Sequence, residues 1–282
     1  MLTATEGRQA RRRPPPSLMQ QYQEYVLQRI EGFKNSMPRE ELLRLGDEAV
    51  SEMQSTTEGQ FVLTEVLMLE SVDRLIMKRL ALRSYRRWRQ QFLKLRAAQR
   101  EPTHWGLEPD CPLVSLLPRV EGEDAALVVG AEAAAYLLAA HDAAVTFIAS
   151  DLGAVERLEA GMANESLASS FTSYFVQPGG WLPALDGPLA LVVVDAGSLS
   201  DATGAARVEF LAALQAHTAV GGVHVLLPGR GRLAPEALLS SYEGWIRDDV
   251  ARSRRRGSTR RRGMVLTRPE QGSEALTQAG RG

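Results

Sequence analysis

The spacing of hydrophobic residues divides the chain into two parts of different character. Across residues 17–100, apolar side chains recur at intervals of three and four, as they do along one face of an α-helix. Ser36, which stands shortly before a proline, and Thr56 or Thr57 are residues of the type that caps helices. The pattern predicts three or four helices, and the longest is expected to run over residues 59–100.

Beyond residue 102, short runs of strand-forming residues alternate with stretches rich in alanine and leucine. Runs such as LALVVVD lack polar alternation, which is typical of strands buried on both faces. Strands are predicted at 125–129, 145–149, 174–177, 189–195, 222–227, 245–249 and 263–268, the last two as an antiparallel pair, and helices at 131–140, 153–163 and 205–217. The predicted fold class is α/β: a doubly wound, seven-stranded, mostly parallel sheet with an N-terminal all-α region.

These patterns predict four segments along the chain. Residues 1–16 combine RRR with PPP, and because proline disfavours helix in the residue before it, a disordered arm is expected there. An N-terminal helical region follows at 17–102, and the α/β domain occupies 103–269. The polar residues 270–282 are expected to form a flexible tail.

The composition indicates a folded globular protein without a disulfide framework. The 282 residues include 33 basic and 34 acidic side chains and 44% hydrophobic residues, as in a folded globular protein. The single cysteine, Cys111, excludes a disulfide framework and fits a reducing compartment, so a cytoplasmic location is expected. The four histidines lack metal-ligand spacing, and no metal site is expected. The longest apolar run, 125–140, is too short to span a bilayer, so no membrane association is expected.

Two stretches of the chain are strongly basic. Ten lysines and arginines and no acidic residue lie between Arg74 and Arg100, interleaved with aromatic residues at helical spacing. Seven more arginines lie between Arg252 and Arg262. One interpretation is a solvated basic face whose aromatic stripe packs on the next domain. The other is a surface for an anionic partner or a nucleic acid, because guanidinium groups and aromatic rings suit phosphates and bases.

Residues 113–269 resemble the class I S-adenosylmethionine-dependent methyltransferases, and among them the tellurite-resistance-type branch. The resemblance lies in an ordered set of features: the strand 189–195 with a Gly-containing loop after it, the turn Val220-Gly221-Gly222 before a strand, the segment 235–245 with Tyr242 and Trp245, and the closing strand 263–268. It implies S-adenosylmethionine as cofactor and methyl transfer to an unidentified acceptor. Methyl transfer depends mainly on positioning, so no catalytic residue is assigned.

The cofactor motif of this family is degenerate here. The family has an acidic residue in the first strand and a Gly-x-Gly-x-Gly turn, whereas Ala126 stands at the acidic position and only Gly130 matches a glycine. Ala149 stands where the second strand should end in the acidic residue that binds the ribose. The resemblance then implies these cofactor-binding residues: Gly130 and Ala131 for the turn, Glu132 or Asp151 for the ribose, Gln177 for the adenine and Asp195 as a carboxylate in the crevice.

Several alternatives stay open at this stage. An inactive methyltransferase-like domain that serves as a binding or assembly module explains the degenerate motif without a cofactor. A nucleic-acid methyltransferase would explain the arginines. Asp195 is either a site carboxylate or a cap for the turn at Gly197 and Ser198. For Trp105 and Trp181, packing is the preferred interpretation over a cover for the cofactor.

Overall fold

The computed structural model describes residues 16–56, 65–120, 124–167, 171–178, 180–185, 187–229, 231–248 and 263–269. Contacts divide the chain into two compact units, residues 1–95 and residues 96–282. The predicted arm, apart from Pro16, the predicted tail and the arginines between Arg252 and Arg262 lie outside the described residues. What was predicted of them therefore stays a prediction.

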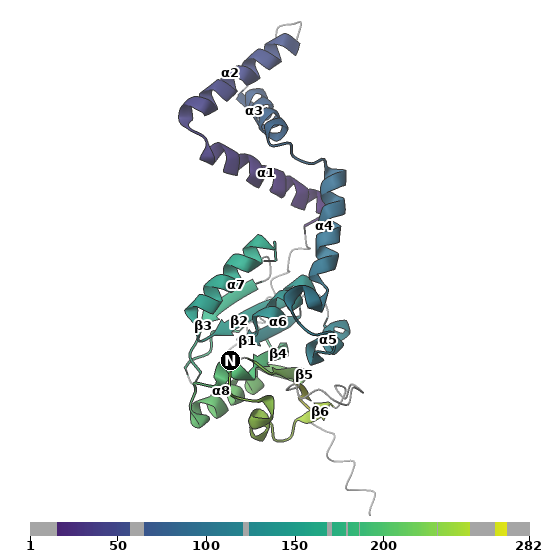
Figure 1. Cartoon of the computed structure of the whole chain (residues 1–282), viewed down its shortest axis with the longest axis vertical. Helices are drawn as coiled ribbons and strands as arrows, with labels where there is room; N and C mark the ends of the chain where they lie inside the picture. The colour runs from purple at the N-terminus through teal and green to yellow at the C-terminus, as the bar shows by residue number, and fades with distance from the viewer. Residues whose placement is uncertain are drawn as a thin grey trace, which may run out of the picture. The chain divides into compact units, whose positions relative to one another are not determined.

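The first unit is built of helices, as its pattern predicts. They are α1 (Leu18–Ser36), α2 (Arg39–Thr56), α3 (Glu65–Arg79) and α4 (Tyr85–Gln99), whose last turn belongs to the second unit (Figure 1). Ser17 caps α1 and exchanges hydrogen bonds with Gln20 in a capping box. The buried apolar residues that hold α1, α2 and α3 together are Ile30, Leu45, Ala49, Val72, Leu75 and Ile76.

The prediction of one helix over residues 59–100 is wrong. The chain turns between α3 and α4 because Ala81 adopts a left-handed conformation, with φ of 47°. There the Leu82 N–H donates to Met77 O at 3.0 Å and the Ala81 N–H donates to Lys78 O at 3.1 Å, a Schellman-type end. Neither glycine nor proline marks this turn, so the sequence pattern runs through it without interruption.

The last turn of α4 packs within the second unit. The Gln99 side-chain amide donates to the backbone and carboxylate oxygens of Glu165 at 3.0 and 2.9 Å. The Trp105 indole N–H donates to Gln99 O at 2.6 Å. These bonds explain why the boundary between the units falls after residue 95 rather than at the expected residue 102.

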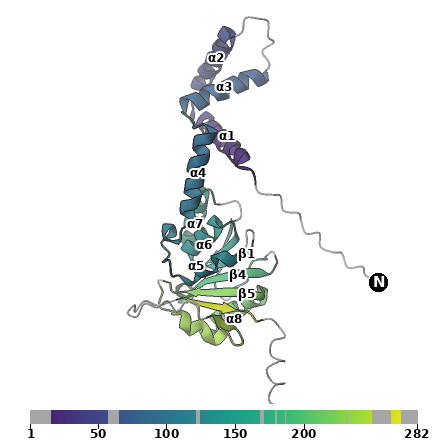
Figure 2. The same cartoon turned by 90° about the vertical axis from the view of Figure 1, so that its right-hand side faces the viewer.

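The second unit contains a seven-stranded sheet (Figure 2). Its strands are β1 (Ala125–Val129), β2 (Ala144–Ala149), β3 (Phe171–Phe175), β4 (Leu189–Asp195), β5 (Thr218–Leu227), β6 (Ile246–Asp248) and β7 (Met264–Thr267). They lie in the order β3-β2-β1-β4-β5-β7-β6. Strands β1 to β5 are parallel, and β7 runs antiparallel to both β5 and β6. The predicted fold class is confirmed: a doubly wound, seven-stranded, mostly parallel α/β sheet with an all-α region before it in the chain.

Helices cover both faces of the sheet, so its central strands are buried on two sides. One core includes α5 (Pro112–Leu116), α6 (Glu132–Ala140) and α7 (Leu152–Asn164), with Val128 pointing toward it. The other includes α8 (Gly204–His217) and the 3-10 helix η5 (Pro235–Ser241), with Leu127 and Val129 pointing toward it. Successive β1 residues thus alternate between two apolar cores, which is why the strand shows no polar alternation.

Two strands begin several residues before their predicted starts, and β3 also ends two residues early, at Phe175, while the other strand ends differ from the prediction by at most one residue. β3 begins at Phe171 rather than at residue 174, because Phe171 to Phe175 pair with β2 from Val145 to Ala149. β5 begins at Thr218 rather than at residue 222. Thr172 and Ser173 interrupt the apolar pattern at the start of β3, and Gly221 and Gly222 interrupt it in β5.

Candidate functional site

Four predicted site residues follow the ends of neighbouring parallel strands. Gly130 follows β1, Asp151 follows β2, Gln177 follows β3, and Asp195 is the last residue of β4. Parallel strands end at the same edge of a sheet, so the structure brings all four to its carboxyl edge. In doubly wound folds, ligands bind at this edge where the strand order reverses, here between β1 and β4.

Gly130 forms the turn after β1 with a left-handed φ of 69°, and its N–H donates to Ile148 O at 2.9 Å. Its missing side chain admits the short 3-10 helix η4 (Ala196–Leu199). A Cβ at Gly130 would lie 2.4 Å from Ser198 Cβ and 2.6 Å from Ser198 Oγ. The Ser198 hydroxyl is held there by donating to Asp195 O at 2.7 Å. The protein's own packing therefore accounts for a glycine at this position.

Glu132 and Asp151, the two candidates for the ribose, converge on one arginine. Arg157 Nη2 lies 3.2 Å from Glu132 Oε1 and 3.7 Å from Asp151 Oδ2. Asp151 also caps α7, since its Oδ1 accepts the Gly153 N–H at 3.0 Å. Arg157 could not be identified from the sequence, because its position depends on α6 and α7 packing beside each other.

Of the two other predicted residues at this edge, Ala131 is buried and Gln177 is exposed. Ala131 is the residue before α6, is buried, and accepts the Ala134 and Ala135 N–H groups at 3.0 and 3.1 Å through its carbonyl oxygen. Gln177 is exposed, and its side-chain amide reaches across to the end of β2, where it donates to Ser150 O at 3.3 Å.

Asp195 caps the turn that follows β4. Its Oδ1 accepts the Gly197 N–H at 2.7 Å, which is the structural role considered for it in the sequence. The carboxylate is half-buried, and desolvation raises its pKa, while hydrogen bonds from the Gly197 and Ser198 backbone partly offset that rise.

Two glycines after β5 let the next loop close over this carboxylate. A Cβ at Gly229 would lie 1.6 Å from Asp195 Oδ1, and a Cβ at Gly231 would lie 2.3 Å from Gly197 O. The Leu233 N–H also donates to Ser200 Oγ at 3.3 Å, which joins this loop to the segment after η4. The sequence analysis did not assign a role to either glycine, although their spacing of two was visible.

The strand positions that carry acidic residues in the resembled family are apolar and buried. Ala126 is 1% exposed and pairs with Val145 and Leu191 inside the sheet. Ala149 is 5% exposed. No carboxylate stands at either position, and the acids that follow these strand ends are Glu132, which is half-buried, and Asp151, which is exposed.

The two tryptophans considered for this region have different environments. Trp105 stacks on Tyr136 of α6 with ring centroids 4.6 Å apart, as the packing interpretation predicts. Trp181, in the segment after β3, is 71% exposed. The packing interpretation is therefore wrong for Trp181, and its ring is accessible to a ligand.

A buried polar cluster lies inside the sheet at His224 of β5. Thr218 Oγ1 donates to Leu214 O at 2.8 Å, so it accepts the His224 Nε2–H at 2.7 Å. The remaining ring nitrogen, Nδ1, accepts the Tyr242 hydroxyl at 2.9 Å. Burial, followed by the charge of Arg268, lowers the pKa of His224 to about 3. A fully bonded, neutral histidine of this kind has a structural role, as its place in an apolar strand predicts.

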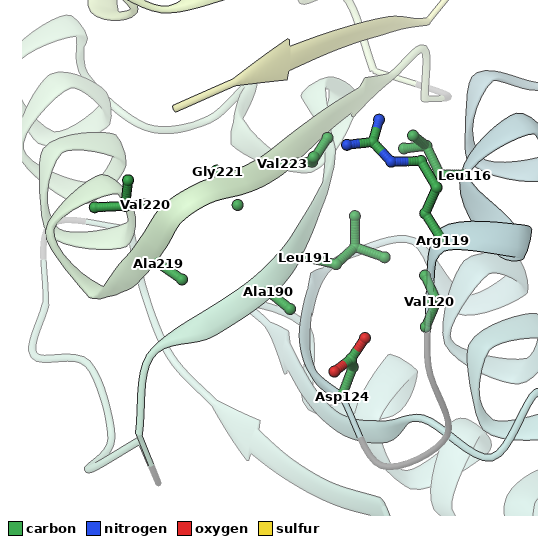
Figure 3. A pocket seen from close by; sticks show the side chains of 11 residues that line it. Leu116, Arg119, Val120, Asp124, Ala190, Leu191, Ala219, Val220, Gly221 and Val223 are labelled. Carbon is green, nitrogen blue, oxygen red and sulfur yellow. The ribbon is translucent and has the colours of Figure 1, made fainter. Parts of the chain in front are cut away.

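A cavity of about 200 Å³ lies at the opposite, amino-terminal edge of the sheet (Figure 3). Figure 3 shows the side chains of Arg119, Asp124 and Leu191 directed toward this space. None of the six predicted site residues is among the described residues that line it.

The cavity exists because the pairing of β4 with β5 is interrupted. Leu189 pairs with Thr218 and Leu191 pairs with Val223. Ala190 of β4 therefore faces an excursion of β5 made of residues 219–222. The walls are mostly apolar, and this edge lies away from the crevice of the doubly wound fold.

The described residues show no sign of a metal site or a membrane segment. Within them, no three His, Cys, Asp or Glu side chains group closely enough to hold a metal ion. None of the described helices is long and apolar enough to cross a membrane. Cys111 is half-buried, and burial raises the pKa of its thiol.

Comparison with known proteins gives structural likenesses only. No family model matches the chain, and no curated protein matches it. An rRNA methylase from Streptococcus thermophilus is 10% identical over 55% of this chain and 93% of that chain, with a TM-score of 0.42. N-methyltransferase NodS from Bradyrhizobium japonicum WM9 is 17% identical over 56% of this chain and 93% of that chain, with a TM-score of 0.43. Glycopeptide N-methyltransferase MtfA, crystallised with S-adenosylmethionine, is 14% identical over 58% of this chain and 95% of that chain, with a TM-score of 0.41.

Proposed function

We propose that the second unit binds S-adenosylmethionine at the carboxyl edge of its sheet and transfers the methyl group to an acceptor that is not yet identified. The observation that carries this proposal is the convergence of Glu132 and Asp151 on Arg157, at 3.2 and 3.7 Å. Two carboxylates that reach one guanidinium also reach one pair of ribose hydroxyls. The ends of β1 and β2, which these acids follow, are where a nucleoside lies in the family that the sequence resembles.

Arg157 does not prevent this use of the two acids. Its side chain is 62% exposed, and the side chains of Glu132 and Asp151 are 38% and 67% exposed. Exposed ion pairs of this kind contribute about 0–1 kcal/mol to stability. Hydroxyl donors of a ligand can therefore replace the guanidinium at small cost.

The other predicted residues complete the binding of the cofactor. Gln177 offers a side-chain amide to the adenine edge, and Asp195 offers a carboxylate near the end that carries the positive charge. S-adenosylmethionine supplies an activated methyl group on a sulfonium when it is bound. The residues of the chain need only hold it in line with the acceptor and exclude water, because positioning supplies most of the rate.

The proposed ribose end offers two carboxylates, whereas the chain itself packs around the residues proposed for the other end. Ser198 lies against Gly130, and the loop at Gly229 lies against Asp195. This closure favours a second candidate function, a methyltransferase-like domain that binds or assembles with partners and does not catalyse. Under this candidate, Gly130 and Asp195 are kept for packing and capping.

The deciding experiment is calorimetric titration of the full chain with S-adenosylmethionine and with S-adenosylhomocysteine. We expect micromolar binding of at least one of them. The variant Glu132→Gln/Asp151→Asn should weaken it by about 10²- to 10⁴-fold, because two charge-assisted hydrogen bonds are lost. Arg157→Gln is the matched control, and it should leave binding unchanged or tighter.

Absence of heat and of thermal stabilisation at millimolar ligand would refute cofactor binding. The second candidate, a non-catalytic domain that binds or assembles with partners, would then be the proposed function. Binding that the double variant does not weaken would place the ribose elsewhere. The tellurite-resistance-type branch and the cytoplasmic location stay predictions from the sequence.

A further inference from the structure

Helix α4 has two faces of opposite character within the first unit. One face carries Tyr85, Trp88 and Phe92, and Trp88 stacks on Phe92 with ring centroids 4.8 Å apart. Tyr22 of α1 lies 5.4 Å from both Tyr85 and Trp88, and Tyr25 lies 6.2 Å from Trp88. The aromatic stripe therefore packs on α1 of the same unit, whereas one interpretation of the sequence assigned it to the next domain.

The other face of α4 is basic and exposed. Arg86, Gln90 and Lys94 are spaced by four, so they lie in one line along the helix. Arg87 and Arg89 flank this line. All five side chains are exposed, whereas the aromatic residues on the opposite side are half-buried. With Arg83, which precedes the helix, the four charged residues form what we call the basic α4 face: Arg83, Arg86, Arg87, Arg89 and Lys94.

Two cations elsewhere in the first unit are paired with carboxylates, unlike the members of the basic α4 face. Lys34 pairs with Asp73 at 2.8 Å, and Arg79 pairs with Glu48. In the part of the chain that the structure describes, no carboxylate lies within ion-pair distance of any member of the basic α4 face. Like charges at spacings of three and four destabilise a helix. The net charge of the protein is only −1, so this segregation does not follow from composition.

We propose that the basic α4 face binds the phosphate backbone of double-stranded DNA. Guanidinium groups match phosphate geometry, and an uncompensated row of them gives most of the affinity of non-specific binding. This is a property of the first unit and does not depend on the function proposed for the second.

The packing of α4 favours duplex DNA over single-stranded nucleic acids and lipid surfaces as the anionic partner. Single-stranded nucleic acids are bound largely by stacking on free aromatic rings, but Trp88 and its neighbours stack on one another and on α1. Insertion into a lipid surface needs an exposed apolar face, but the aromatic face of α4 is packed against α1. A helix fits the major groove of DNA, which is about 12 Å wide, whereas the major groove of duplex RNA is too narrow for side chains.

The binding should depend steeply on salt. If four phosphates are neutralised, the slope of log K against log salt is about −3.6, since each contributes about −0.9. An increase from about 50 to about 200 mM salt then weakens binding by about 10²-fold. Fluorescence anisotropy of the full chain with a labelled duplex of about 20 base pairs measures this slope.

The test variant is Arg86→Gln/Arg87→Gln/Lys94→Gln. Glutamine forms helices about as well as arginine and lysine, so α4 should be retained, and circular dichroism checks this. We expect the slope to become shallower by about 2.7 and the affinity at low salt to fall by at least about tenfold.

The matched control is Arg29→Gln/Arg39→Gln/Arg44→Gln. It removes the same three charges from exposed positions of α1 and α2 in the same unit, and it should leave the slope unchanged. Equal slopes for the wild type and the α4 variant would overturn the proposal. So would tighter binding of duplex RNA or single-stranded DNA than of duplex DNA, or no binding at about 50 mM salt.

Discussion

Replacing His224 with glutamine is expected to reduce the loss of stability that this protein undergoes between pH 7 and pH 5. The side chain is fully buried, and burial lowers its pKa from 6.5 to about 3. The imidazole is therefore neutral in the folded protein at pH 5, while the same group in the unfolded chain is protonated below about pH 6.5. As the pH falls, only the unfolded state gains this proton, so the free energy of unfolding decreases.

The magnitude follows from the two pKa values. Below about pH 6.5 the free energy of unfolding falls by about 1.4 kcal/mol per pH unit, until the folded-state pKa of about 3 is reached. Between pH 7 and pH 5, His224 alone accounts for a loss of about 2 kcal/mol. Urea unfolding followed by tryptophan fluorescence at pH 7, 6 and 5 measures the loss. The difference between wild type and His224→Gln separates it from the titration of carboxylates.

The glutamine variant is expected to be less stable at pH 7 by about 1–3 kcal/mol, because Tyr242 loses its acceptor. Tyr242→Phe is the matched control, since it removes the same hydrogen bond and leaves His224 in an apolar environment. It should therefore keep the pH dependence of the wild type. If wild type and His224→Gln lose stability in parallel from pH 7 to pH 5, burial does not hold this histidine neutral.

Four further substitutions test the second unit, and one substitution in the first unit serves as a control. Gly130→Ala should reduce the free energy of unfolding by about 2–4 kcal/mol, because the φ of Gly130 is 69° and the new Cβ would lie 2.4 Å from Ser198 Cβ. As the control, Gly46→Ala, in open space on α2, should raise the free energy of unfolding by about 0.5–1 kcal/mol. Equal effects of the two substitutions in thermal unfolding would contradict this reasoning. Asp195→Asn should stabilise the protein more at pH 7 than at pH 4, and asparagine should still cap the turn. Burial raises the pKa of the Asp195 carboxyl, so its ionised form opposes folding at pH 7. A larger gain in stability at pH 4 would show that burial does not raise this pKa. Ala190→Leu, at the cavity, should change stability by less than about 1 kcal/mol, whereas Ala126→Leu in the core should cost about 1–3 kcal/mol, and urea unfolding distinguishes them.

The candidate site divides into residues whose place was predictable and contacts that were not. The sequence order of Gly130, Asp151, Gln177 and Asp195 after successive strands was enough to predict that they share one edge. Nothing in the sequence near Gly130 shows that Ser198 lies against it. Whether these residues hold a cofactor stays a prediction that binding experiments can test.

Hydrophobic patterning was enough to predict the strands and the mostly parallel, doubly wound class of the sheet, but not the order of its strands. The apolar runs that became β1 and β4 have the predicted bounds, because a segment buried on both faces has no polar position that would blur its ends. The helices α6, α7 and α8 lie within one residue of their predicted starts and ends for a similar reason.

Only the tertiary structure decided the features that depend on contacts between distant segments. The turn at Ala81 needs no glycine, so local pattern could not reveal it. Arg157 binds two acids from separate helix starts, and the excursion of β5 opens a cavity beside Ala190. Hydrophobic periodicity records which face of an element is buried, but it carries no information about which atoms of another segment meet that face. That is why the fold could be predicted here, while the contact between Gly130 and Ser198 could not.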